Sequence, residues 1–204
     1  MANYNAIRYN VPYSDGAAGS LRLIKTLTAS SSSTLSFVDG SSDVVLDSTY
    51  KEYLFILNNI HPSDNAVAFQ FNGSADTGSN YNATKTTSFH QGYTEEDGGS
   101  TAWGYDTGSD LAQSTNFQNF TSGSLANNND DCLAGMVRLF NPSSTTFVKH
   151  FMIEAQAINS TSDPNLTINK IGGYFNTTSA IDAIQFKCAS GTIDAGTIQL
   201  FGVL

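Results

Sequence analysis

The segment Ser179–Leu204, SAIDAIQFKCASGTIDAGTIQLFGVL, decides the fold class. In its first half apolar residues alternate with polar ones, at Ile184, Phe186 and Cys188. Its second half is apolar in both phases of the alternation, at Ile198, Leu200 and Leu204 in one phase and at Phe201 and Val203 in the other. Alternation with period two indicates a strand with one buried face, whereas apolar residues in both phases indicate a strand covered on both sides. We therefore expect two β-strands joined by a Gly-containing turn, the second of them in the core.

The rest of the chain repeats this pattern between turn signals such as Asp39-Gly40, Asn72-Gly73 and Asn141-Pro142. The further strands are expected at 21–29, 34–38, 44–46, 50–57, 66–71, 85–90, 133–140, 146–157 and 165–175. Counted with the closing pair, this gives about ten short strands and almost no helix, which is typical of antiparallel sandwiches. We predict an all-β fold, an antiparallel jelly-roll-like β-sandwich, in one domain over 21–204.

Residues 1–20 lack any sustained period and are rich in tyrosine and glycine. They are expected to form an extended N-terminal arm. Such an arm is either disordered, as termini often are, or it docks on a neighbouring subunit, where tyrosines bury area at low entropic cost. The candidate docking residues are Tyr4, Arg8, Tyr9 and Tyr13.

Residues 91–130 form the second irregular part and are predicted to be a long loop excursion, with one short helix over 110–120 as an option. Long loops without periodicity are commonly functional or disordered. The excursion contains the aromatic residues Tyr93, Trp103 and Tyr105. We place the candidate interaction surface there.

Composition excludes several classes of function. Charged residues make up only 13% of the chain, and the net charge is −9. A nucleic-acid-binding protein needs a basic patch, so we expect no nucleic acid as partner, nor an anionic membrane. The N-terminus lacks the pattern of a signal peptide, and no apolar run reaches the roughly 18 residues of a membrane-spanning helix. The protein is therefore expected to be made in a cytoplasm.

No catalytic, cofactor-binding or metal-binding motif is present. The sequence lacks a nucleophile elbow, a phosphate-binding loop, a dinucleotide fingerprint and a zinc-protease motif. Two oxygen-rich runs, Glu95–Asp97 and Asn127–Asp131, are expected to be solvated loops, with a calcium site as the alternative. Cys132 and Cys188 lie in apolar strand patterns and are expected to be buried free thiols, with one disulfide as the alternative.

Three segments resemble a family of jelly-roll virion proteins of tailed phages, found particularly in marine phages. The first is Leu46–Leu54, LDSTYKEYL. The second runs from Phe71-Asn72-Gly73 to Gly78-Ser79-Asn80-Tyr81, and the stretch between its glycines is longer than in the family. The third is Ser179–Ile184 together with Ala195–Val203, where the family ends in a Leu-Tyr-Gly-Ile pattern. The match is spread over residues 46–203 and contains no catalytic motif.

The resemblance implies a non-enzymatic virion structural protein, with a capsid decoration or cement protein on the head surface as the leading expectation. Its partners would be other virion proteins, such as the major capsid or tail protein, and copies of itself. Closed symmetry is usual for such components, and the family class suggests a trimer. The alternative is a tail or fibre module that binds a host surface glycan. In that case Tyr93, Trp103 and Tyr105 would stack on sugar rings.

Overall fold

The computed structural model describes residues 21–122, 125–159 and 164–204, and these ranges contain β-strands and no helix. The strands are β1 Leu21–Thr28, β2 Leu35–Val38, β3 Glu52–Pro62, β4 Phe69–Ser74, β5 Lys85–Glu95, β6 Thr101–Tyr105, β7 Gln118–Asn119, β8 Leu133–Phe140, β9 Lys149–Asn159, β10 Asn165–Phe175, β11 Ala183–Cys188 and β12 Ile193–Val203. The predicted all-β sandwich is therefore confirmed. The described ranges contain no helix with the length and apolarity to span a membrane.

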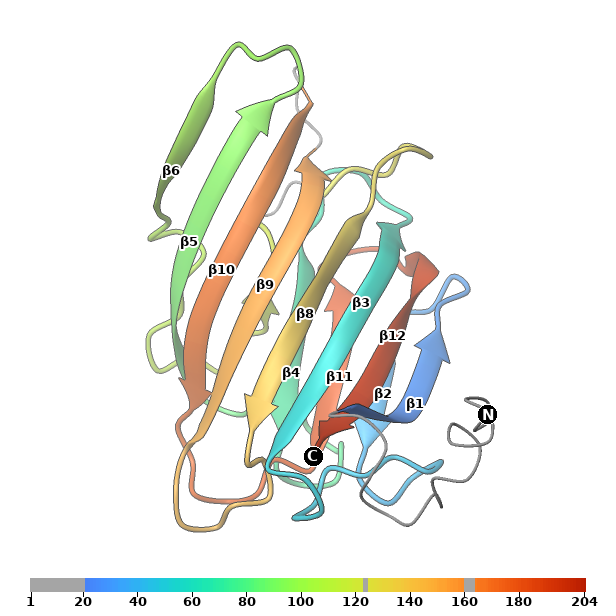
Figure 1. Ribbon diagram of the computed structural model, residues 1–204, viewed down its shortest axis with the longest axis vertical. Coiled ribbons are helices and arrows are strands. Elements are labelled where there is room, and N and C mark those ends of the chain that lie inside the picture. The colour runs from blue at the N-terminus through green and yellow to red at the C-terminus, as the bar shows by residue number, and fades with distance from the viewer. Residues whose placement is uncertain (1–20, 123–124, 160–163) are drawn as a thin grey trace, which may run out of the picture.

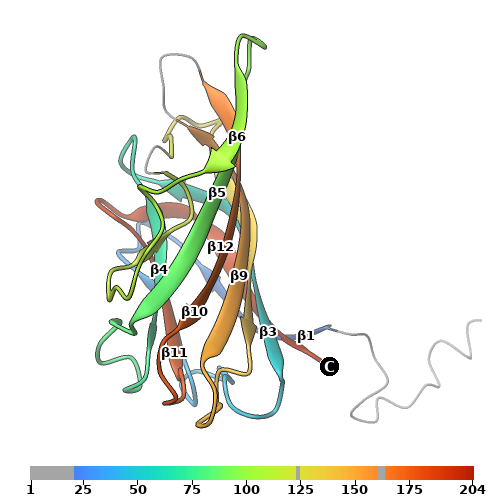
Figure 2. The same cartoon turned by 90° about the vertical axis from the view of Figure 1, so that its left-hand side faces the viewer.

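The strands form two antiparallel sheets that pack face to face (Figures 1 and 2). The large sheet has eight strands in the order β1-β12-β3-β8-β9-β10-β5-β6, and the small sheet has four in the order β2-β11-β4-β7. Consecutive strands from β1 to β5 change sheet at every connection, as do β10 to β12. Only the β5–β6 and the β8–β9–β10 connections join neighbours within one sheet.

Side-chain alternation explains why these segments are strands. In β9 the buried residues Phe151, Ile153 and Ala155 alternate with the exposed Met152 and Glu154. The central strands of the large sheet thus turn one row of side chains towards the small sheet and the other row away from it.

The core between the sheets is rich in phenylalanine. Phe186 of β11 lies at its centre, fully buried, with ring centroids 5.5–6.2 Å from those of five other phenylalanines. These are Phe37, Phe55, Phe69, Phe71 and Phe120. Ring pairs at this spacing prefer edge-to-face or offset geometry, which fixes the relative position of the two sheets.

The closing segment has the two predicted strands, but they do not pair with each other. β11 lies in the small sheet between β2 and β4, whereas β12 lies in the large sheet between β1 and β3. The turn between them, which contains Gly191 at φ 65°, crosses from one sheet to the other. One row of the second strand lies in the core, because Ile198 and Leu200 are fully buried. Phe201 and Val203 on its other side are only partly buried, so the expected cover on both sides is not found among the described residues.

Other sequence-based expectations need correction. Residues 44–46 form no strand, although Val44 and Leu46 are buried. The proposed excursion over 91–130 is interrupted, since β5 continues to Glu95, β6 follows it as a hairpin partner, and β7 lies within the rest. The optional helix over 110–120 is absent from these residues. Backbone hydrogen bonds to neighbouring strands, such as Ser114 N to Lys85 O at 2.9 Å, take the place of helical ones.

Two lysines are buried at one end of the sandwich. Lys85 of β5 and Lys149 of β9 both lie opposite Phe175 of β10. The Lys85 Nζ donates a hydrogen bond to the Asn116 carbonyl at 2.5 Å, and the Lys149 Nζ to the Thr177 carbonyl at 3.1 Å. Each ammonium group therefore satisfies a loop carbonyl that would otherwise lack this donor.

Candidate interaction surface

The large sheet presents one face to solvent, which we call the outer face. In the described part of the chain no second layer of strands covers it, as the side view in Figure 2 shows. The strand register places the following apolar residues in its outward rows: Leu21, Leu23, Leu54, Ile56, Trp103, Tyr105, Met136, Met152, Leu166, Ile168, Phe201 and Val203. Solvated sheet faces normally carry polar residues, so this apolar face indicates an interaction surface.

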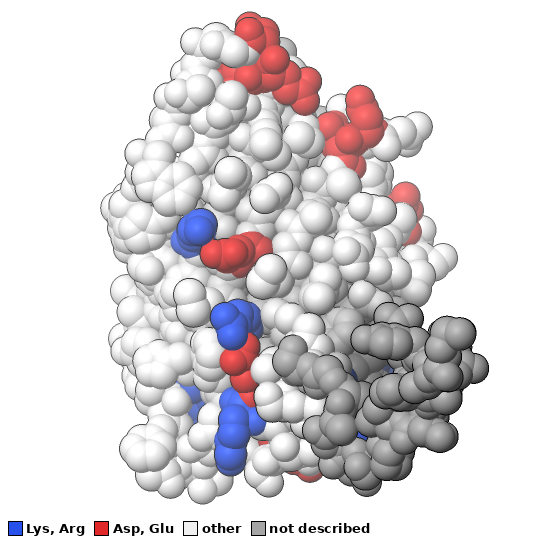
Figure 3. Space-filling view, viewed as in Figure 1, with Lys and Arg blue, Asp and Glu red and all other residues white. Residues whose placement is uncertain are grey.

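The charged side chains in the middle of the outer face are paired with one another. Arg138 contacts Glu52 through Nη2–Oε1 at 2.5 Å, and Lys170 contacts Glu154 through Nζ–Oε1 at 3.2 Å. These four residues sum to zero charge in a chain of net charge −9. Figure 3 shows a face that is largely uncharged between these pairs, with acidic side chains gathered at the end where β5 and β6 meet.

The β5–β6 end of the outer face carries an aromatic pair. Trp103 and Tyr105 project to the same side of β6 and are 58% and 49% exposed. Gly92 lies opposite Trp103, and a Cβ at Gly92 would come within 2.5 Å of the indole Cε3. Glycine is therefore what lets the indole lie over β5. The Tyr105 ring packs edge-to-face on His90, with centroids 5.1 Å apart.

Tyr105 is held further by a hydrogen bond. Its hydroxyl donates to Asp110 Oδ2 at 2.5 Å, which raises the pKa of Tyr105 above its ordinary value. This bond ties β6 to the loop that follows it.

The structure separates Tyr93 from the other two aromatic residues. Tyr93 pairs with Ala102, so its side chain points to the opposite face of the sheet from Trp103. Its hydroxyl lies 3.2 Å from Ser100 Oγ. The four arm residues proposed from the sequence, Tyr4, Arg8, Tyr9 and Tyr13, lie outside the described residues.

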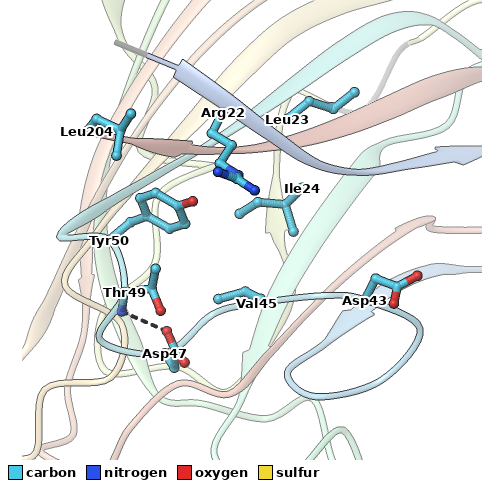
Figure 4. Close-up of a pocket in the computed structure, with 9 residues that line it drawn as sticks. All are labelled: Arg22, Leu23, Ile24, Asp43, Val45, Asp47, Thr49, Tyr50 and Leu204. Atoms are coloured by element: carbon cyan, nitrogen blue, oxygen red, sulfur yellow. Dashed lines mark hydrogen bonds between the residues drawn. The ribbon is translucent and has the colours of Figure 1, made fainter. Parts of the chain in front are cut away.

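An open pocket of about 550 Å³ lies beside the first strand (Figure 4). It is bordered by Arg22 and Ile24 of β1 and by the loop residues Asp47 and Tyr50. Thr49 N donates to Asp47 Oδ1 at 2.7 Å, and the Thr49 hydrogen bonds lower the pKa of Asp47. The pocket combines a guanidinium group, carboxylates and apolar walls.

A second pocket, of about 500 Å³, lies between the β6–β7 loop and the small sheet. Lys187 Nζ lies 4.4 Å from the centroid of the Phe117 ring, and Gln70 Nε2 donates to Asn119 Oδ1 at 2.8 Å. Asp110, which binds Tyr105, also lines this pocket. Amide groups beside a charged and an aromatic side chain suit a hydroxyl-rich ligand.

The two thiols and the acidic loops were the remaining candidates for a disulfide or a metal site. Cys188 is buried and Cys132 is half-buried, and both are free, so the alternative of a disulfide is not realised. Burial raises the pKa of Cys188 to about 12 and also raises that of Cys132, which keeps both protonated at neutral pH. Over residues 21–122, 125–159 and 164–204 there is no group of three or more His, Cys, Asp or Glu that could hold a metal ion.

Sequence reasoning located the aromatic pair but missed the breadth of the outer face. The available signal was apolarity in both phases of a strand, seen in β12 as Phe201 and Val203 beside Ile198 and Leu200. Comparison of the chain with protein-family models, with curated proteins and with solved structures finds no match.

Proposed function

We propose that this chain is a non-enzymatic structural protein of a phage virion that decorates or cements the capsid surface. The observation that carries the proposal is the outer face, a broad sheet surface with apolar rows and internally paired charges. Covering such a surface with a partner protein is favourable by about 25 cal/mol per Å² of apolar area. Because its charges are already paired, a partner can cover it without leaving an unpaired ion.

The strand order supports the resemblance to jelly-roll virion proteins. The sets β1-β12-β3-β8 and β2-β11-β4-β7 face each other as two four-stranded sheets joined by connections that cross between them. An eight-stranded jelly roll has two such sheets. On this interpretation β9, β10, β5 and β6 are an extension that widens one sheet and with it the outer face.

The proposal is tested by counting copies in purified particles of the phage that encodes the chain, using quantitative mass spectrometry. Hundreds of copies per particle support decoration, a handful place the protein in the tail, and none refutes a virion role. Met152→Lys puts a charge in the middle of the outer face and should lower incorporation at least about tenfold, since tenfold corresponds to only about 1.4 kcal/mol.

Phe147→Lys is the matched control, because Phe147 is 70% exposed in the β8–β9 connection, away from the outer face. It should leave incorporation unchanged. Equal incorporation of both variants would show that the outer face is not the docking surface.

A second candidate is a tail or fibre module that binds a host glycan. The pocket lined by Asp110, Phe117, Asn119 and Lys187 favours it, since it offers amide and charged groups beside an aromatic ring. Binding on a glycan array that is lost with Lys187→Ala and weakened with Trp103→Ala would support this function. Absence of binding to every glycan tested would end it.

A further inference from the structure

The outer edge of β6 presents unpaired backbone groups. Asp106 N donates to Phe89 O at 2.9 Å, and Glu95 N donates to Ser100 O at 3.0 Å, which fixes the alternation of hydrogen bonds between β6 and β5. It follows that the N–H and C=O groups of Thr101, Trp103 and Tyr105 point away from β5. No strand among the described residues pairs with them.

This edge lacks the protection that the other edge of the same sheet has. β1 carries Arg22 and Lys25, and its register with β12 is shifted between Leu23 and Lys25. Charges and bulges of this kind prevent an edge from pairing with another strand. β6, with the sequence TAWGY, contains no charged residue and no proline, and its pairing with β5 is continuous.

Residues 1–20 as a whole have no sustained period, but within residues 1–13, MANYNAIRYNVPY, a short alternation from Ile7 to Tyr13 suits pairing with this edge. Side chains alternate so that Ile7 and Tyr9 would lie on one side and Ala6 and Arg8 on the other. We propose that this N-terminal segment of one copy adds as a ninth strand to the edge of β6 in a neighbouring copy. The apolar side would then cover Trp103, and the unpaired backbone groups of β6 would gain partners.

Charge favours the same pairing. Arg8 is the only charged side chain in residues 1–13, whereas the chain as a whole is strongly acidic. Acidic residues flank β6 at both ends, with Glu96 and Asp97 before it and Asp106 and Asp110 after it. Two β6 edges would repel each other through these residues, so the segment with Arg8 is the better partner than a second β6.

Geometry favours exchange between copies over pairing within one chain. β1 and a strand added outside β6 are separated by eight steps of about 4.8 Å, or roughly 38 Å across the sheet. The eleven steps from residue 10 to Leu21 span at most about 36–40 Å when fully stretched, and about 18 Å on average as a flexible chain. Within one copy the connection would have no slack. Between copies, the β1 side of one molecule meets the β6 side of the next, which is a head-to-tail arrangement that forms a ring where the rotation closes and a filament where it does not.

The fluorescence of Trp103 provides a direct test, because it is the only tryptophan in the chain. In the full-length protein, dilution should shift its emission to longer wavelength as the mass measured by light scattering falls to that of the monomer. An excess of a synthetic peptide of residues 1–13 should also lower the mass, but the emission should stay at short wavelength because the peptide occupies the edge. A scrambled peptide should do neither. A monomeric mass at every concentration, or a peptide without effect, would overturn the proposal.

A second measurement separates exchange from pairing within one chain and requires no change in β6. Full-length protein with Tyr9→benzoylphenylalanine is prepared in normal and ¹⁵N-labelled form, mixed, and irradiated. Cross-links from residue 9 of one isotope to residues 90–106 of the other support exchange. Cross-links within one isotope only, or to another region, refute it.

The edge itself is tested with Gly104→Lys. A Cβ at Gly104 has open space around it, so the fold should tolerate the lysine while the edge gains a charge. The mass should fall to that of the monomer at concentrations where Phe147→Lys, a lysine at a 70% exposed position in the β8–β9 connection and away from both sheet edges, remains assembled. Assembly that survives Gly104→Lys would contradict the proposal. The proposal holds or fails independently of whether the chain is a virion protein.

Discussion

Lys85→Met should make the protein more stable at neutral pH and should remove the rise in stability that Lys85 itself contributes in mild alkali. Lys85 is fully buried, and this burial lowers its pKa from 10.5 to about 7. Between these values the unfolded chain holds a proton that the folded chain has released. The free energy of unfolding therefore rises with pH over this range.

The size of the effect follows from the shift. A difference of about 3.5 pKa units corresponds to at most about 5 kcal/mol. The hydrogen bond from Nζ to the Asn116 carbonyl and the Phe175 ring at 6.0 Å favour the charged form, so a smaller net value is expected. Between pH 7.5 and 9.5 we expect Lys85 alone to contribute a gain of about 2 kcal/mol to the free energy of unfolding.

The assay is urea unfolding followed by far-ultraviolet circular dichroism at pH 7.5, 8.5 and 9.5, with thiols kept reduced. The stability advantage of Lys85→Met over wild type should shrink by about 2 kcal/mol across this range. Lys170→Met is the control, because the exposed pair with Glu154 contributes less than about 1 kcal/mol. A constant difference between Lys85→Met and wild type would show that Lys85 keeps an ordinary pKa and would refute the reasoning.

Two further predictions concern packing. Phe186→Ala removes the ring at the centre of the core and should lower the free energy of unfolding, measured in urea, by about 3–5 kcal/mol. The control Phe147→Ala, at an exposed position, should lower it by less than about 0.5 kcal/mol. A loss below about 1.5 kcal/mol for Phe186→Ala would contradict the central position of that ring. Gly92→Ala should displace the indole of Trp103, because the new Cβ would come within 2.5 Å of it, and should change the tryptophan emission spectrum of the monomer without loss of fold. An unchanged spectrum would show that the indole does not lie over β5.

Local alternation was sufficient to predict the class of fold and most strands. It identified β9 and β10 because each buried row has a polar or exposed counterpart on the other face. It failed for β6, since TAWGY is exposed at every position and has no buried row to produce a period. A strand of this kind exists because β5 provides its hydrogen bonds, and that pairing is not visible in five residues.

Pairing between strands was likewise beyond local sequence. β11 and β12 are adjacent in the chain and were predicted as a joined pair, but each lies in a different sheet. The same holds for the aromatic residues, since Tyr93 and Trp103 are separated by the register of β5 and β6 rather than by distance along the chain. A shift of one residue in the register between β5 and β6 would have put the rings of Tyr93, Trp103 and Tyr105 on one face of the sheet.

The separate positions of β11 and β12 have a consequence for how the chain folds during synthesis. Among the described strands, β2 joins the small sheet only through β11, and β1 joins the large sheet only through β12. Both early strands therefore wait without these partners until β11 and β12 have been made. Such long-range pairing slows folding and leaves strands exposed to aggregation while it is incomplete. A nascent chain stalled before residue 183 should thus be captured by chaperones that bind extended apolar segments, and synthesis of β11 and β12 should end that capture.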